Sequence, residues 1–118
     1  MRKRVDCPEL ISEVAYCDGY LYKISASFIP TTAYIRLSKE DTLFGATIDQ
    51  IDATLKIHGG CTYRGFDDEH NSFWIGWDYG HAEDFVKGLP TLAEVREDVC
   101  NVVAQLQNRK TASRLYIS

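Results

Sequence analysis

The pattern of apolar positions is most regular near the C-terminus, where it follows the period of an α-helix. Apolar residues recur at helical spacing between Leu92 and Leu106 and form one stripe. Thr91 and Glu94 have the spacing of a capping box, and Pro90 stands just before them. The pattern predicts a helix over residues 92–108 with one apolar face. The stripe consists of Leu92, Val95, Val99, Val102, Val103 and Leu106.

Earlier segments carry the aromatic and β-branched residues that are typical of strands. Pro30 separates the first two of them, because proline forces the preceding residue into an extended conformation. Strands followed by one amphipathic helix predict an α+β fold, an antiparallel β-sheet with a C-terminal α-helix packed on one face. Residues 8–16 also allow a short helix. The predicted strands are residues 20–28, 33–37, 54–63 and 72–79.

Length and composition are those of one globular domain spanning residues 1–118. Apolar residues make up 45% and charged residues 25%, and no apolar run is long enough to cross a membrane. The basic N-terminus lacks the apolar stretch of a secretory signal, so we expect a cytosolic setting. We expect the cysteines to be reduced and structural, since they show no zinc-ligand spacing. They are Cys7, Cys17, Cys61 and Cys100.

The net charge of −4 argues against binding to duplex nucleic acid, which requires a broad basic surface. Basic residues nevertheless cluster after the predicted helix, at Arg109, Lys110 and Arg114. This cluster is either a solvated terminus or a source of cations for a small phosphorylated ligand. The acidic run at residues 67–69 is interpreted as a solvated hairpin tip, because it lacks the alternating ligands of a calcium loop.

Most of the candidate chemistry falls in two segments, residues 57–65 and 73–84, which hold glycines, both tryptophans and two of the three histidines. If the two predicted strands pair, His58 lies opposite Asp78 on an outer face that also carries Trp74. The aspartate would raise the pKa of the imidazole. Facing glycines would leave a shallow trough for a planar ligand beside the indole. The alternative is an exposed cross-strand ion pair that contributes little.

The end of the last predicted strand offers a second interpretation. Asp78 and His81 have a spacing that places two ligands on one metal ion, and Asp84 or His58 would complete the set. Alternatively, His81 and Asp84 hold the loop by hydrogen bonds to the backbone. No nucleophile elbow, phosphate-binding glycine loop or catalytic triad spacing is present, and no cofactor is predicted.

These residues resemble a family of small proteins encoded by phages and prophages. The shared pattern is a His-Gly-Gly strand followed by an aromatic strand that ends in glycine, aspartate, histidine and aspartate, and it extends over residues 43–106. The resemblance brings no established activity. It implies a viral protein that acts against bacterial defence in the host cytoplasm. Its main motifs are His58-Gly59-Gly60-Cys61-Thr62-Tyr63 and Phe73-Trp74-Ile75-Gly76-Trp77-Asp78-Tyr79-Gly80-His81-Ala82-Glu83-Asp84.

The leading hypothesis is a phage anti-defence sponge, a homo-oligomer that sequesters a nucleotide-derived signal without cleaving it. The alternatives are a metal-dependent phosphodiesterase or hydrolase, an acidic inhibitor of a host defence protein, and a structural virion protein. No membrane partner is expected. The hydrolase would use His58, Asp78, His81 and Asp84 to hold a cation that activates water. The predicted ligand-binding residues are His58, Tyr63, Arg64, Trp74, Asp78, Tyr79, His81, Asp84, Arg109 and Arg114.

Overall fold

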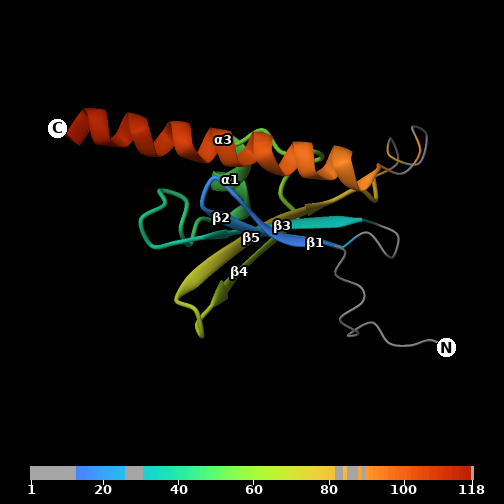
Figure 1. Ribbon diagram of the computed structural model, residues 1–118. Helices are drawn as coiled ribbons and strands as arrows, with labels where there is room; N and C mark the ends of the chain where they lie inside the picture. Colours follow the sequence, from blue (N-terminus) through green and yellow to red (C-terminus); the bar gives the residue numbers. More distant parts are fainter. Residues whose placement is uncertain (1–12, 26–30, 82–83, 85–87, 89, 118) are drawn as a thin grey trace.

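The computed structural model describes residues 13–25, 31–81, 84, 88 and 90–117, with the backbone alone for residues 111–117 (Figure 1). Five antiparallel strands form one sheet in the order β1-β2-β3-β5-β4. The strands are β1 (Glu13–Cys17), β2 (Tyr20–Ser25), β3 (Thr32–Leu37), β4 (Tyr63–Asp67) and β5 (Ser72–Asp78). The helices are α1 (Ile48–Thr54) and α3 (Leu92–Ile117).

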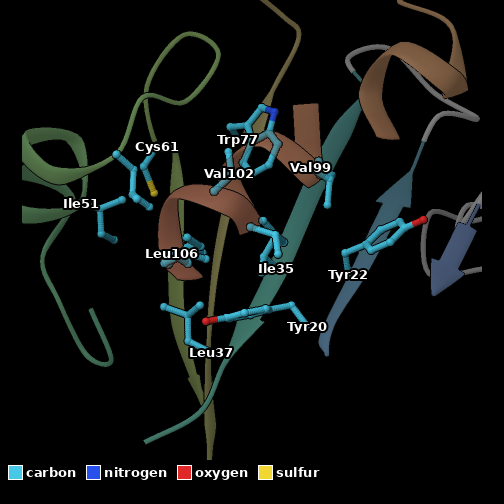
Figure 2. Close-up of a cluster of buried hydrophobic side chains, with 14 of the residues drawn as sticks. Tyr20, Tyr22, Ile35, Leu37, Ile51, Cys61, Trp77, Val99, Val102 and Leu106 are labelled. Atoms are coloured by element: carbon cyan, nitrogen blue, oxygen red, sulfur yellow. The ribbon is translucent and has the colours of Figure 1, made fainter. Parts of the chain in front are cut away.

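Helix α3 lies across one face of the sheet, which confirms the predicted α+β architecture (Figure 1). The apolar stripe of α3 packs on the side chains that every second residue of the strands turns toward it (Figure 2). Ile35 lies opposite Ile75, and Ala33 lies opposite Trp77. All four side chains are at most 1% exposed, so the centre of β3 and β5 forms the middle of the core.

The N-terminal cap of α3 has the predicted geometry. The Thr91 hydroxyl accepts a hydrogen bond from the Glu94 backbone N–H at 3.1 Å, and the Glu94 carboxylate accepts one from the Thr91 N–H at 2.8 Å. The helix continues past the predicted end at residue 108 to Ile117. Residues 109–117 contain no glycine or proline to end it, although the apolar stripe has already stopped.

The predicted strand over residues 54–63 is wrong. Helix α1 occupies residues 48–54, and its cap Thr47 forms a second capping box with Gln50. Gly59 and Gly60 then have φ angles of +68° and +87°, which a strand does not allow. The strand that pairs with β5 is therefore β4, which begins only at Tyr63.

Two further predicted segments fall only partly within the described residues. Residues 13–16 of the suggested N-terminal helix belong to β1, which pairs with β2 in a hairpin, while residues 8–12 lie outside the described residues. The predicted strand over residues 20–28 is β2 as far as Ser25, beyond which the chain is not described. The cysteines that are described are free thiols, as expected, and Cys7 lies outside the described residues.

The predicted opposition of His58 and Asp78 would place Thr62 opposite Trp74, but Gly65 lies there instead, so the register between β4 and β5 differs from the predicted one by three residues. An odd shift turns every side chain of the strand to the other face. Phe66 now shares the helix-side face with Phe73, while Tyr63 lies opposite Gly76 on the outer face. The predicted opposition of His58 and Asp78 is therefore wrong, since His58 lies outside the paired strands.

A charged contact ties β1 to α3. Arg96 donates to both carboxylate oxygens of Glu13, at 2.6 and 2.9 Å, and the Tyr22 hydroxyl donates to the same group. These hydrogen bonds, that of Arg96 first, lower the pKa of Glu13 from 4.5 to about 2. The carboxylate is therefore more stable in the folded chain than in the unfolded one.

This contact predicts a pH-dependent stability. Because the folded pKa of Glu13 is depressed, its contribution is complete above pH 4.5 and is lost as the pH falls toward 2. We expect Glu13→Gln to lower the free energy of unfolding by about 1 kcal/mol at pH 7, a value reduced for the solvent exposure of Arg96. Urea unfolding should show this difference shrinking toward pH 2.5, with Glu97→Gln as the exposed control. A difference that stays constant with pH would contradict the assignment.

Candidate functional site

Two histidines and an aspartate meet beyond the end of β5. His58 Nε2 lies 2.7 Å from Asp84 Oδ1, and His81 Nδ1 lies 3.5 Å from Asp84 Oδ2. One potential metal-binding atom from each of the three residues lies within 4.8 Å of the others. Asp78 Oδ1 is 3.7 Å from His81 Nδ1. We call His58, His81 and Asp84 the histidine cluster.

A tight turn carries His58 into this cluster. The Gly60 N–H donates to the carbonyl of Ile57 at 2.9 Å, which makes residues 57–60 a β-turn. Gly59 is the third residue of the turn, and its φ of +68° favours glycine. A Cβ at this position would lie 2.5 Å from Cε1 of His81. Glycine is therefore required both by the turn and by the imidazole packed against it.

Asp84 is the buried member of the cluster, with 4% of its surface exposed. One carboxylate oxygen contacts His58, and the other accepts a hydrogen bond from the His81 backbone N–H at 3.0 Å. Burial acts to raise the pKa of Asp84, but the hydrogen bonds from the His81 backbone and His58 outweigh it and lower that pKa. The group is therefore a carboxylate, and the predicted backbone hydrogen bond within the loop is present.

Tyr79 forms the buried floor beneath His58. The two rings stack with centroids 4.3 Å apart, and the Tyr79 hydroxyl donates to Asp98 of α3 at 2.6 Å. The same hydroxyl accepts from Trp77 Nε1 at 3.2 Å. Burial first, and then the hydrogen bond to Asp98, raises the pKa of Tyr79. With 2% of its surface exposed, Tyr79 supports His58 and does not present its ring to a ligand.

A second group of side chains lies on the sheet face opposite α3, which we call the open face. Tyr34 and Trp74 alternate with buried residues, and Tyr63 lies opposite Gly76, so all three side chains point to this face. Tyr63 is 46% exposed and meets the ring of Tyr34 edge-on, with centroids 5.4 Å apart. The open face therefore presents neighbouring aromatic rings, with no helix packed over them among the described residues.

The predicted trough between facing glycines is absent, because Tyr63 lies opposite Gly76 and Trp74 lies opposite Gly65. A Cβ at Gly76 would lie 2.5 Å from the ring of Tyr34, and one at Gly65 would lie 2.8 Å from the hydroxyl of Tyr63. The glycines thus allow the rings to lie close against the sheet backbone. The result is a surface of neighbouring aromatic rings in place of the predicted groove.

Two cations flank Trp74 on the open face. Lys23 Nζ lies 4.6 Å and Arg36 Cζ lies 5.9 Å from the centroid of the indole ring. Trp74 Nε1 donates to Asp67 at 3.2 Å, and His70 contacts the same carboxylate at 2.9 Å. Trp74 therefore belongs to a site of its own, and its indole does not join the imidazole of His58 as predicted.

The remaining predicted site residues lie elsewhere. Arg64 donates to the carbonyls of Ala46 and Gly45 at 2.6 and 3.1 Å, so its guanidinium holds the segment before α1. Arg109 is exposed on α3, and the side chain of Arg114 lies outside the described residues. Asp78 accepts a hydrogen bond from the Gly80 N–H at 2.8 Å at the end of β5.

Sequence reasoning missed Lys23, Tyr34 and Arg36. A signal for them existed, because each alternates with buried residues in β2 or β3. Applying this alternation across three neighbouring strands would have brought them onto the face of Trp74.

Comparison of the chain with protein-family models, curated proteins and solved structures gives no match. Among the described residues, no helix combines the length and the apolar character needed to cross a membrane.

Proposed function

We propose that this protein binds a nucleotide-derived small molecule on the open face of its sheet and holds it without cleaving it. The observation that carries this proposal is the combination of Trp74 and the exposed Tyr63 with the cations Lys23 and Arg36. Aromatic rings stack on nucleobases, and a lysine or arginine next to them binds phosphate. These residues take the place of Tyr79 and Arg64 as proposed ligand contacts, because the side chains of Tyr79 and Arg64 make their contacts within the fold.

Local charge on the open face is compatible with an anionic ligand, although the whole chain carries −4. Asp67 shares the face, but its carboxylate is occupied by Trp74 and His70. Lys23 of β2 and Arg36 of β3 both place their cations at the indole ring of Trp74. A phosphate beside a stacked base would meet these two cations first.

The resemblance to phage proteins supports a biological setting for this binding. A phage protein that retains a nucleotide signal unchanged would disarm a host defence system that depends on that signal. One face of a sheet covers only one side of a small ligand, so a second copy of the chain would complete the site. Val14 and Tyr16, 54% and 66% exposed on the edge strand β1, offer apolar surface for such an assembly.

Calorimetry against a panel of cyclic and linear nucleotides tests the proposal, with native mass spectrometry reporting the assembly state and any retained ligand. We expect tight binding of one nucleotide class to a homo-oligomer and recovery of the ligand intact. Trp74→Ala should weaken binding about 10-fold or more, since stacking on one base contributes about 1–3 kcal/mol. The control is Phe66→Ala, an exposed aromatic on the other face of the sheet.

Three results would overturn the proposal. They are the absence of binding across the panel, binding that Trp74→Ala leaves unchanged, and binding of short single-stranded oligonucleotides alone. Recovery of a hydrolysed ligand would favour the hydrolase hypothesis instead.

A further inference from the structure

The histidine cluster has a feature that its internal hydrogen bonds do not explain. His81 Nδ1 is buried, and it has no hydrogen-bond partner among the described residues. The nearest carboxylate oxygens, those of Asp84 and Asp78, lie 3.5 and 3.7 Å away, too far for a good hydrogen bond. Buried polar atoms in folded proteins are normally satisfied, so an unpartnered ring nitrogen next to two carboxylates requires an explanation.

The spacing around this nitrogen is that of metal ligands. Two ligands about 2.0–2.1 Å from a tetrahedral ion lie roughly 3.3–3.4 Å apart. The 3.5 Å between His81 Nδ1 and Asp84 Oδ2 is close to this value. His58 Nε2 lies 2.7 Å from Oδ1, the other oxygen of the Asp84 carboxylate. A small outward movement of the His58 ring would admit an ion between all three residues.

We propose that His58, His81 and Asp84 form a binding site for a divalent transition-metal ion, with Zn²⁺ as the best match. Two imidazoles and one carboxylate suit Zn²⁺ and its neighbours, whereas Mg²⁺ and Ca²⁺ prefer a set of oxygen ligands. Asp78 is left out of the ligand set because it does not belong to the group of residues whose ligand atoms all lie within 4.8 Å of one another. This assignment does not depend on ligand binding at the open face.

The surrounding fold holds the ligands in place and leaves one side of the ion accessible. Tyr79 stacks under His58, and the absent side chain of Gly59 makes room for His81. The side chains of His58 and His81 remain 30% and 37% exposed. A cavity of about 370 Å³ borders His58 and is lined by polar residues of α3 that include Asp98 and Gln105. Three protein ligands leave a fourth position on a tetrahedral ion, and the partial exposure of both imidazoles opens that position to water or another small ligand.

Metal titration of the full chain after chelator treatment tests the site. Isothermal titration with ZnCl₂ should give one ion per chain. In thermal unfolding, the Tm should rise with metal concentration. Co²⁺ should give the visible absorption of a four-coordinate ion. We expect His81→Ala and Asp84→Asn each to weaken Zn²⁺ binding more than about 100-fold, beyond the loss typical for residues that only orient a ligand.

The matched control is His70→Ala. His70 belongs to a second group of potential ligands with Asp67 and Glu69, but this group is exposed, and it lies at the hairpin between β4 and β5. The control should bind Zn²⁺ as the parent chain does. His58→Gln provides an independent test if His81→Ala or Asp84→Asn fails to fold.

Three outcomes would overturn the metal assignment. These are less than one bound ion per chain, unchanged affinity in folded variants of the histidine cluster, and an equal loss in His70→Ala. Failure here would leave binding at the open face unaffected, because Trp74 and the histidine cluster are probed by separate variants.

Discussion

Replacing Trp77 with alanine will lower the free energy of unfolding by about 3–5 kcal/mol, the range for removing a large aromatic side chain from a packed core. Trp77 is 1% exposed, and it packs under α3 with Val99 and Val102 (Figure 2). Its Nε1 also donates to the Tyr79 hydroxyl, which loses this partner in the variant. Urea unfolding followed by circular dichroism measures the change.

The second tryptophan supplies the control. Trp74 lies on the open face of the same strand, so Trp74→Ala should cost about 1 kcal/mol or less. The two substitutions remove identical side chains and differ only in the face from which they remove them. Equal losses of stability would contradict the placement of α3 on the face of Trp77.

Replacing Gly59 with alanine will lower the free energy of unfolding by about 2–4 kcal/mol. About 1–2 kcal/mol comes from the left-handed backbone at φ +68°, and the rest comes from overpacking. The new Cβ would lie 2.5 Å from His81 Cε1, so the imidazole must move. Chemical denaturation of the variant measures the sum of the two effects.

Gly19→Ala separates these effects. Gly19 has a φ of +87°, yet a Cβ there would meet nothing within 4 Å. It should therefore show the backbone cost alone. The double variant Gly59→Ala with His81→Ala should recover most of the free energy of unfolding that overpacking removes. If Gly59→Ala and Gly19→Ala prove equally destabilising, the close packing of Gly59 on His81 is refuted.

The open face and the histidine cluster both depend on β5. Trp74 lies within the strand, whereas His81 and Asp84 belong to the segment that follows it. Asp78, the last residue of the strand, hydrogen-bonds the Gly80 N–H and lies near His81. A single strand thus carries Trp74 on the open face, and His81 and Asp84, which follow it in the sequence, lie close to His58.

The sequence alone determined the elements whose signals are local. The capping box of Thr91 and Glu94, with the apolar stripe behind it, specified the start and the buried face of α3. Alternation specified that Phe73 and Trp77 share the core face, while Trp74 lies outside. Each of these features depends on residues only a few positions apart. The sequence also held a capping box at Thr47 and Gln50, which the strand interpretation of the following residues overlooked.

Only the tertiary structure decided which residues meet across the fold. The register of β4 on β5 depends on where β4 begins, and the turn at Gly59 and Gly60 delays that start to Tyr63. The partner of His58 is Asp84, 26 residues away in a segment outside the sheet, and not the aspartate that strand pairing predicted. Spacing along the chain cannot specify such a contact, because it joins the turn after α1 to a residue beyond β5 and depends on how the whole fold brings the two together.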